Sequence, residues 1–566
     1  MCPGDSPSQR PTTASRALTE TAPEPQGVPR GGVGQRPNLV ITGFMATGKT
    51  RVGRMMAKRL GRPFLDMDAE IETRAGKSIP RIFAEDGESA FRQAEATLCR
   101  EVSNQQGWVV ATGGGALLDA DSRAAVLGSS TVVCLTCEPN EILARLKEGD
   151  EPSRPLLDVA DPAAEIERLL AQRRPAYAAI PWQVDTTRLS VARVVEKVAQ
   201  LENVVTLPVR HPGGMYPIHV GSGLLDQVGG ALRATGVLEG SAVAVVSNPV
   251  VAPLHGARVI DTLAAAGLRP FTCSVPDGER HKTVHTVIDL YGQFLDHQLD
   301  RSGTVLALGG GVTGDIAGFA AATFMRGVRF AQVPTTVLAM ADSSVGGKTG
   351  VDLPQGKNLA GAFKQPAMVL IDVDVLGTLP SEEIRSGMVE VLKHGVIADP
   401  GLFGELALPP ADIRSPITPV QLARTLRVKI DIVEKDPYER GRRAALNLGH
   451  TVGHSLERLS EYTLRHGEAV GIGMVAAARI AAALGRAGSQ VAEEIEAALA
   501  AWGLPVRCPP HDVDTIWAAM AHDKKRRGRV LRWVLPRAIG QVEISEDVPQ
   551  HVVRAVLLEM GARREG

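Results

Sequence analysis

The sequence predicts an α/β protein in which a phosphate-binding loop domain, a parallel sheet with flanking helices, is followed by a two-part unit. That unit combines an α/β dinucleotide-binding domain with a mostly α-helical metal-binding domain. Three observations predict this organisation. A short apolar strand leads into the glycine-rich loop 43–50 and a helix, and a second strand leads into the glycine-rich turn 309–314 and another helix. Later in the chain, His450 and His454 stand four residues apart in a helical pattern.

The composition is that of an ordinary globular chain with a weak overall field. Of its 566 residues, 44% are hydrophobic and 22% are charged, and the formal net charge is −1. We therefore expect small-molecule substrates and no nucleic-acid or membrane partner, and any anion must be bound locally. Six scattered cysteines, no apolar run of membrane-spanning length and no signal-peptide core predict a cytoplasmic protein. Cys134 and Cys137 form a C-x-x-C in a strand-like run that points them to opposite faces, which argues against a zinc or redox role.

The first folded domain is predicted over 37–199. Residues 1–36 before it are rich in Pro, Gly, Ser and Thr and are expected to form a disordered tail. In the loop G-x-x-x-x-G-K-T, backbone N–H groups can surround the phosphates of ATP, Lys49 can reach the β- and γ-phosphates, and Thr50 can coordinate Mg²⁺. The expected nucleotide-binding residues are Gly43, Ala46, Thr47, Gly48, Lys49 and Thr50.

Further motifs follow this loop in a fixed order. Asp66 and Asp68 are expected at the end of a strand, on the same side because strands have a period of two. Arg92 lies in a helix-like segment, and a later strand ends in three glycines, 113–115. Two more arginines then appear, Arg154 in SRPLLD and Arg173 in QRRPAY. In this order and spacing, the motifs resemble shikimate kinase over essentially the whole of residues 37–200.

The resemblance implies that shikimate is held by Asp68, Arg92, Gly114 and Arg173, with the arginines forming planar pairs with its carboxylate. Asp68 would orient, and could deprotonate, the attacking hydroxyl. By the same resemblance Asp66 assists Mg²⁺, and Arg154 sits on a lid over the phosphates. Singly, the two aspartates could instead form a loop cap, and Arg173 could belong to a solvated arginine pair. A small-molecule kinase of the gluconate type is the other interpretation of this half.

The second unit is predicted to begin after a linker at 200–205. Alternating strand signals are followed by a buried parallel strand that ends at Asn248. The G-x-G-x-x-G turn at 309–314 is a weak dinucleotide signal by itself, and no convincing acidic residue about 20 positions later could hold a ribose hydroxyl. The dinucleotide-binding domain is predicted over 206–380.

A stretch dense in small residues contains Lys348, Lys357 and Asn358 beside glycine turns. In a chain without a net positive field, these residues predict a strong local anion site. Beyond it, amphipathic or buried helices predict a mostly helical domain over 381–562, with a site in the cleft between the two domains.

Candidate metal ligands gather in this helical domain. His450 and His454 share one helix face, His466 follows after a short polar break, and Glu390 lies upstream on another helix-like run, with Lys393 three residues later. One carboxylate and two imidazoles are the usual ligands of a catalytic zinc that keeps one coordination position open. Taken alone, the pattern also fits tight helix packing around partly buried histidines.

The whole second unit, about 203–562, resembles 3-dehydroquinate synthase. The motifs GGGVTGD, MRG, PTT, ADSSVGGKTG, GKN, GMVEVLKHG, NLGHTVGH, HGEAV and HDKK carry the resemblance and occur in this order. The resemblance implies Glu390, His450 and His466 as ligands of Zn²⁺ or Co²⁺, and His454 as a catalytic or substrate-binding group. It places NAD⁺ against Asn248, Asp277, Glu279, Lys282, Gly310, Gly311, Val312, Asp315, Thr335, Thr336, Lys348, Lys357 and Thr378. It places substrate against Arg326, Asp342, Lys348, Asn358, Lys393, Lys429, Arg443, Asn447, His454 and one of Lys524 and Lys525, with Arg326 as the residue that would reach a neighbouring subunit of a homodimer.

One polypeptide would then carry two enzymes of the route to aromatic amino acids. The groups expected to act most directly are Lys49, Asp68 and Arg154 in one half, and Lys348, Lys393, His454 and Arg443 in the other. In the second reaction, 3-deoxy-D-arabino-heptulosonate 7-phosphate is oxidised by NAD⁺, loses phosphate, is reduced again and closes to a carbocycle, with no net redox change. The alternatives are a metal-dependent polyol or glycerol-phosphate dehydrogenase, which would accumulate NADH, and a half that is only a binding or scaffolding module.

Overall fold

The computed structural model describes most of the chain beyond the predicted tail. The described residues are 37–148, 159, 161–437, 441–461, 463–527 and 531–564. The tail at 1–36 and Arg154 lie outside the described residues, as do the side chains of Lys524 and Lys525. Within the described segments, no helix is long and apolar enough to cross a membrane.

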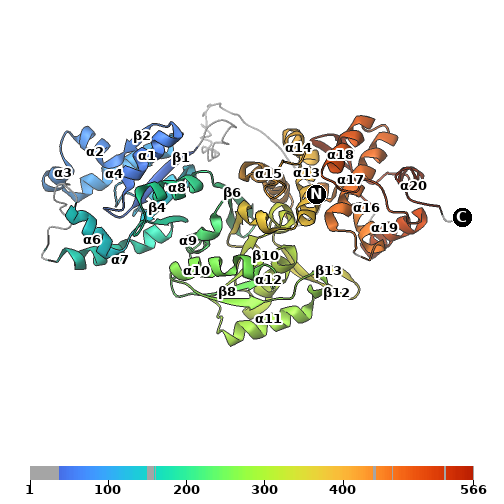
Figure 1. The fold of residues 1–566 in the computed structure, drawn as a ribbon, viewed down its shortest axis with the longest axis horizontal. Coiled ribbons are helices and arrows are strands. Elements are labelled where there is room, and N and C mark those ends of the chain that lie inside the picture. The colour runs from blue at the N-terminus through green and yellow to red at the C-terminus, as the bar shows by residue number, and fades with distance from the viewer. Residues whose placement is uncertain are drawn as a thin grey trace, which may run out of the picture. The chain divides into compact units, whose positions relative to one another are not determined.

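The first sheet is parallel throughout (Figure 1). Helices follow its strands, and β1 is fully buried, as its apolar run 39–41 predicts. Its strand order is β2-β3-β1-β4-β5, so the crevice at the carboxyl end of β1 is where the order reverses and where such sheets bind ligands. The strands are β1 (Asn38–Gly43), β2 (Phe64–Asp66), β3 (Val109–Ala111), β4 (Ser130–Thr136) and β5 (Trp182–Asp185). The helices are α1 (Lys49–Leu60), α2 (Met67–Ala75), α3 (Ile79–Glu85), α4 (Gly87–Ser103), α5 (Ala120–Ser129), α6 (Pro139–Glu148), α7 (Pro162–Ala178) and α8 (Val191–Glu202).

Two local predictions in this half need correction. Strand β2 ends at Asp66, and Asp68 lies in the first turn of α2, so the two aspartates do not share a strand face. The carboxylate of Asp66 accepts from the backbone N–H groups of Asp68 and Ala69, which makes Asp66 the N-cap of α2. The expected linker is also shorter than predicted, because residues 200–202 form the last turn of α8 and β6 begins at Val205.

The second sheet has seven strands in the order β6-β7-β14-β11-β10-β8-β9. β6 and β7 form an antiparallel hairpin, and the remaining pairs are parallel. The strand order reverses between β8 and β10, which places a ligand crevice at their carboxyl ends. The strands are β6 (Val205–His211), β7 (Gly214–Gly221), β8 (Ala242–Ser247), β9 (Arg269–Ser274), β10 (Thr304–Gly309), β11 (Arg329–Pro334) and β14 (Val369–Asp372). The accompanying helices are α9 (Val228–Ala234), α10 (Ala257–Ala265), α11 (Val284–Asp296) and α12 (Gly311–Thr323).

The predicted anion-binding stretch forms a hairpin rather than a series of turns. β12 (Lys348–Leu353) pairs with β13 (Gly356–Phe363) in antiparallel fashion. Lys348 begins the first strand, and Lys357 and Asn358 lie near the start of the second. Gly350 and Gly361 allow the close approach of these strands, because a Cβ on Gly361 would lie 2.2 Å from the carbonyl oxygen of Thr349.

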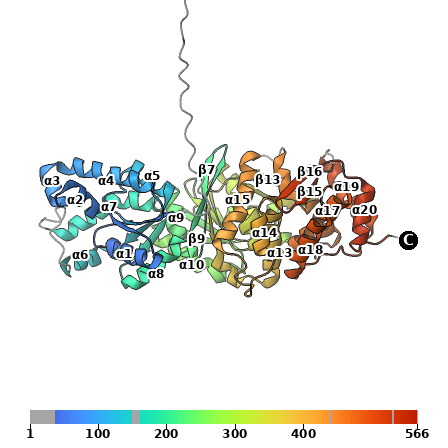
Figure 2. The same cartoon turned by 90° about the horizontal axis from the view of Figure 1, so that it is seen from above.

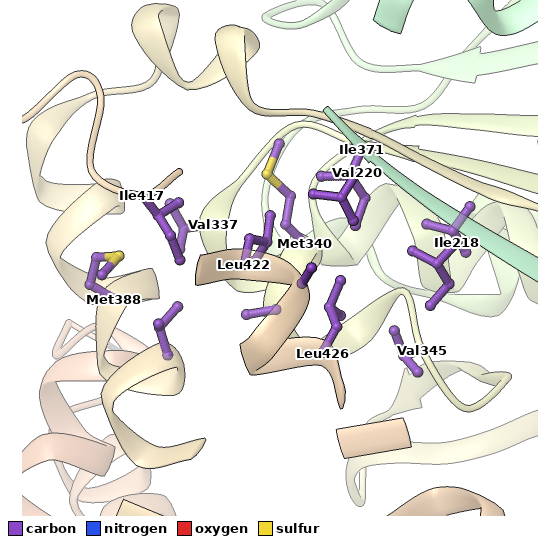
Figure 3. Packing of buried hydrophobic residues seen from close by; sticks show 14 of the residues in the cluster. Ile218, Val220, Val337, Met340, Val345, Ile371, Met388, Ile417, Leu422 and Leu426 are labelled. Carbon is purple, nitrogen blue, oxygen red and sulfur yellow. The ribbon is translucent and has the colours of Figure 1, made fainter. Parts of the chain in front are cut away.

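The C-terminal part is helical, with one added hairpin, as Figure 2 shows. Helix α15 packs on the second sheet: Figure 3 shows Leu422 and Leu426 of α15 near Ile218 and Ile371 of β7 and β14. The predicted α/β fold class is therefore confirmed. The helices are α13 (Ser381–Ala398), α14 (Pro400–Leu406), α15 (Pro419–Lys435), α16 (His450–Leu459), α17 (His466–Ala483), α18 (Ser489–Ala501), α19 (Val513–Arg527) and α20 (Gln550–Glu559), and the hairpin is β15 (Trp533–Ala538) with β16 (Gln541–Ser545).

The first and second sheets are joined by direct contacts as well as by the chain. The ring of Trp182 at β5 meets the ring of His219 of β7 edge-on, with centroids 4.8 Å apart. The backbone N–H of Gln183 donates to Gln227 Oε1 at 3.0 Å. A Cβ on Gly230 in α9 would lie 2.7 Å from the carbonyl oxygen of Pro181, so α9 packs closely against this segment. The connection is thus a packed interface rather than a free tether.

Candidate active sites

The loop after β1 has the backbone geometry of a phosphate cradle. Ala46 has φ 58° and Gly48 has φ 95°, so two positions adopt the left-handed conformation within one short loop, and Gly48 precedes the first turn of α1. The Thr47 hydroxyl donates to the carbonyl oxygen of Phe44 at 2.8 Å, and Lys49 Nζ donates to the same oxygen at 2.9 Å. The Thr47 hydroxyl and the Lys49 ammonium group therefore meet at one carbonyl oxygen within the loop.

A predicted Mg²⁺ pair is brought together beside this loop. The Thr50 hydroxyl donates to Asp66 Oδ2 at 2.7 Å, although the two residues are 16 positions apart. A hydroxyl and a carboxylate oxygen are both ligands that Mg²⁺ accepts beside nucleotide phosphates. Thr50 and Asp66 could hold the ion from the loop side and the β2 side.

Three side chains closely approach the three glycines after β3. A Cβ on Gly113 would lie 2.6 Å from Asp68 Oδ1, and a Cβ on Gly115 would lie 2.1 Å from Arg92 Nη1. At Gly114 the nearest atom would be Arg173 Nη1, at 3.3 Å. Asp68, Arg92 and Arg173, which are far apart in sequence, therefore converge on one short glycine turn.

The structure adds two residues to this cluster that the sequence interpretation missed. Arg92 Nη1 donates to Glu95 Oε2 at 2.6 Å, and burial raises the pKa of Glu95 against the opposing field of Arg92. Arg173 Nη1 donates to the carbonyl oxygen of Gly114 at 3.2 Å, and Tyr177 donates to the same oxygen at 2.8 Å. Glu95 and Tyr177 follow their arginines at spacings of three and four, so helical periodicity could have indicated both.

Arg145 is a further residue that sequence reasoning missed. It lies on α6 and donates to the carbonyl oxygens of Ala46 and Thr186, at 3.4 Å and 2.7 Å. It therefore joins the phosphate loop to the end of β5. Its pairing with Glu141 four residues earlier made it look like an ordinary surface charge.

The predicted dinucleotide residues surround the crevice between β8 and β10. Asn248 follows β8, and its side chain donates to Asp277 Oδ1 at 2.7 Å while accepting from the N–H groups of Val250 and Val251. Gly310 precedes the first turn of α12 and has no side chain to fill the space there. Thr335, at the end of β11, has a buried hydroxyl with no hydrogen-bond partner among the described residues. Glycine-lined helix N-termini and unpaired polar groups fit a bound dinucleotide.

A charged pair links this crevice to the β12–β13 hairpin. Lys282 Nζ lies 2.6 Å from Asp315 Oδ2 and donates to Asn358 Oδ1 at 2.6 Å. Burial raises the pKa of Asp315 to about 6, although Lys282 opposes this effect. Asn358 has φ 54°, a conformation that Asn tolerates better than most residues. Lys357 pairs with Glu279 at 3.3 Å, so two residues of the hairpin contact residues predicted to bind the dinucleotide.

Glu390, His450 and His466 form a compact ligand group in the helical domain. Their nearest ligand atoms all lie within 4.8 Å of one another. Glu390 Oε1 is 3.9 Å from His450 Nε2 and 3.6 Å from His466 Nε2. Both Glu390 oxygens are buried without a hydrogen-bond partner among the described residues, although Lys393 forms an ion pair with Oε2. A buried carboxylate with unused acceptor capacity that faces two imidazoles fits a divalent cation.

The protonation preferences of the two histidines differ. Burial, assisted by Lys393, holds the pKa of His450 well below its usual value, so its ring is neutral as a metal ligand must be. At His466, burial opposes protonation, but the adjacent carboxylates of Glu390 and Glu457 raise the pKa to about 10. Two carboxylates that stabilise positive charge on this ring would also stabilise a divalent cation beside it.

Three cationic side chains are buried near these ligands. Lys393, Lys429 and Arg443 are 1%, 4% and 4% exposed, although such residues are rarely buried without partners. Lys429 pairs with the carboxylate of Asp342, and although Asp342 is half-buried this contact holds the pKa of that carboxyl below its usual range. A Cβ on Gly346 would lie 2.7 Å from Arg443 Nη2. The chain thus keeps buried positive charge close to the ligand group.

The other predicted substrate residues lie in more open surroundings. Lys348, Asn447 and His454 are exposed, and the ring centroid of His454 is 5.0 Å from that of His450. Arg326 is exposed beside Asp300 and Met325 rather than among the buried cations, and its φ of 68° follows the φ of 48° at Met325. The remaining predicted dinucleotide residues are Gly311 and Val312 at the start of α12, Thr336 just after β11, and Thr378 at the end of the 3-10 helix Val373–Thr378.

Comparison with known proteins agrees with this division. The shikimate kinase model matches residues 45–202, and the N-terminal and C-terminal models of 3-dehydroquinate synthase match 272–386 and 387–526. A 3-dehydroquinate synthase of Nostoc punctiforme is 45% identical over 359 residues, which are 62% of this chain and 98% of that protein. This chain belongs to the 3-dehydroquinate synthase family. A shikimate kinase domain precedes the synthase unit, so the chain is a fusion of two enzymes.

Other relatives of the synthase unit are similar to the same extent or share its fold. The 3-dehydroquinate synthase of Thermosynechococcus vestitus is 45% identical over 364 residues, 63% of this chain and 99% of that protein. The solved 2-epi-5-epi-valiolone synthase of Streptomyces hygroscopicus, with NAD⁺ and Zn²⁺ bound, is 27% identical, with a TM-score of 0.55 over 61% of this chain and 96% of its own. A 2-deoxy-scyllo-inosose synthase with carbaglucose-6-phosphate, NAD⁺ and Co²⁺ is 26% identical, with a TM-score of 0.56 over 63% of this chain and all of its own.

Proposed function

We propose that the second half converts 3-deoxy-D-arabino-heptulosonate 7-phosphate to 3-dehydroquinate and phosphate. The observation that carries this proposal is the pairing of the Glu390, His450 and His466 group with three buried cations. A substrate with a carboxylate at one end and a phosphate at the other needs such an anion-binding set. A polyol dehydrogenase needs neither end of this set, and a glycerol-phosphate dehydrogenase needs only the phosphate end, because its substrate carries no carboxylate.

The synthase residues have distinct tasks in this proposal. Glu390, His450 and His466 hold Zn²⁺ or Co²⁺, and the residues around the β8–β10 crevice hold NAD⁺; when bound, these groups supply Lewis acidity and a hydride acceptor. Lys429 and Arg443 clamp the substrate carboxylate, and because both are buried their charges act at low local dielectric. Lys348, Asn358 and His454 bind the phosphate, with Lys393 and Asp342 between the two ends. Fixed charges at both ends keep one substrate geometry through several steps.

We propose that the first half transfers phosphate from ATP to shikimate. Arg92 and Arg173 bind the shikimate carboxylate, and Asp68 orients the attacking hydroxyl toward the phosphate loop. Lys49 stabilises charge on the transferring group, while Thr50 and Asp66 hold Mg²⁺. The convergence of these side chains on the 113–115 turn supports a small acid as acceptor. A gluconate-type kinase is the alternative, and ADP formation measured with shikimate and with gluconate separates the two.

The synthase proposal is tested by following phosphate release and NADH absorbance in one sample with catalytic NAD⁺. Phosphate release without NADH accumulation supports the synthase reaction. Steady NADH formation without phosphate release would assign this half to the dehydrogenase class. We also propose a cytoplasmic location and a homodimer in which Arg326 reaches the active site of the neighbouring subunit. The homodimer is tested by sedimentation of the wild type and of Arg326→Ala, with the synthase activity of each protein measured in parallel.

A further inference from the structure

A second carboxylate lies behind the metal-facing histidine of the synthase half. Glu457 is on α16, and its side chain is only 10% exposed. Its Oε1 atom is 3.3 Å from Nδ1 of His466, while Nε2 of the same ring is 3.6 Å from Glu390 Oε1. The two nitrogens of His466 therefore face two different carboxylates.

Only one of these carboxylates belongs to the proposed ligand group. Nε2 of His466 points at the group that contains Glu390 and His450, so this nitrogen must offer its lone pair to the metal. In a neutral imidazole the other nitrogen, Nδ1, then carries the proton and needs an acceptor. Glu457 Oε1 is in the position of that acceptor.

We propose that Glu457 is the positioning residue for His466, and that it fixes the tautomer and orientation of the ring so that Nε2 binds the metal. The inference rests on the proposed function, because it takes Glu390, His450 and His466 as ligands. A carboxylate behind a ligating histidine raises the basicity of the ring and restricts its rotation, and both effects tighten metal binding. Glu457 does not touch the substrate or the metal in this arrangement.

The helix geometry supports a fixed rather than accidental contact. His450, His454 and Glu457 stand at spacings of four and seven on α16, so they lie on one face of the helix. That face is turned toward α17, which begins with His466 and lies beside α16 (Figure 1). The two helices approach so closely that a Cβ on Gly473 would lie 1.9 Å from the carbonyl oxygen of Gly449. This close packing keeps Glu457 and His466 at one separation.

A second metal bound by His454, Glu457 and His466 is the competing interpretation, because their ligand atoms also lie within 4.8 Å of one another. It would require Nδ1 of His466 to lose its proton while Nε2 binds the first metal. An imidazole that bridges two metals in this way is a different chemical species, an imidazolate. A neutral ring that donates from Nδ1 to Glu457 needs no such deprotonation, so we favour the positioning role.

The test measures metal affinity and stoichiometry on the full chain, independently of catalysis. Glu457→Gln and Glu457→Ala are compared with wild type by competition of Zn²⁺ against a chromophoric chelator, and Co²⁺ absorption spectra report the ligand field. The matched control is Glu496→Gln, which removes the charge of a half-buried carboxylate on α18 that pairs with Arg479 at 2.6 Å. Thermal unfolding of each variant reports whether it is folded.

The inference predicts one metal per chain in all these proteins. Affinity should be about 10- to 100-fold weaker in both Glu457 variants and unchanged in Glu496→Gln. Wild-type affinity in both folded Glu457 variants would overturn it, as would two metals in wild type and one in Glu457→Ala. His450→Ala separates this result from a failure of the proposed function. If wild type binds no metal, or His450→Ala binds as well as wild type, the proposed ligand group itself is wrong.

Discussion

Replacing Gly115 by alanine is a small change that tests the shikimate site directly. The new Cβ would lie 2.1 Å from Arg92 Nη1, and its three nearest atoms all belong to the Arg92 guanidinium. To reach ordinary contact the guanidinium must move by more than 1 Å. It is held against this movement by Glu95, at 2.6 Å, whose side chain is 3% exposed, and by Glu88, at 2.9 Å. The clash therefore displaces Arg92 from the position in which it would bind the substrate carboxylate.

The expected loss is that of one charge-assisted hydrogen-bonding pair. Such a contact contributes about 1.5–3 kcal/mol, so kcat/KM for shikimate should fall by about 10- to 150-fold. The assay is ADP formation with varied shikimate, with 3-dehydroquinate synthase activity of the same preparation as the measure of folding. Gly128→Ala is the matched control, because its Cβ meets no atom within 4 Å. An unchanged shikimate KM in folded Gly115→Ala would refute the carboxylate-binding role of Arg92.

Three further predictions follow from the two sites and their connection. Lys49→Ala should abolish kinase activity and leave synthase activity intact, and His450→Ala should do the reverse; loss of both activities in either folded variant would contradict two independent sites. Gly473→Ala should push the backbone of Gly449 away and lower the free energy of unfolding by about 1–3 kcal/mol in thermal unfolding. It should also weaken Zn²⁺ binding, because the ligand His450 directly follows Gly449. Burial lowers the pKa of His219 to about 4, so the free energy of unfolding should fall by up to about 3 kcal/mol as the pH drops from about 6.5 toward 4. His219→Asn should flatten this pH dependence. An unchanged slope of unfolding free energy against pH in the variant would contradict the role of His219.

The sequence was most informative where chemistry requires a fixed local pattern. Local sequence patterns mark three such segments: the phosphate loop, the helix that carries His450 and His454, and the strand–turn–helix at 309–314. The structure places each of them in the predicted type of element. The errors arose where tertiary pairing decides the outcome. The segment around Lys348 and Lys357 forms a β-hairpin, because its two runs of small residues can approach closely. No local sequence signal marks that strand pairing.

The supporting residues were the least predictable part of both sites. Glu457 acts through His466 on another helix, so its position matters only once the fold brings the two helices together, whereas Glu95 stands one turn after Arg92 on the same helix. Arg145 looked like a helix-surface charge because its partners, Ala46 and Thr186, are backbone carbonyls 99 and 41 residues away. Long-range backbone contacts leave no trace in residue spacing.

Selective metal removal tests the central claim of two separate active sites in one chain. The full-length protein is treated with a chelator of transition metals, returned to buffer with Mg²⁺ and NAD⁺, and assayed for both reactions. Phosphate release from 3-deoxy-D-arabino-heptulosonate 7-phosphate should disappear and return with Zn²⁺ or Co²⁺, without NADH accumulation, while ADP formation with shikimate stays unchanged throughout. Phosphate release that survives complete metal removal, or kinase activity that falls with it, would contradict the account.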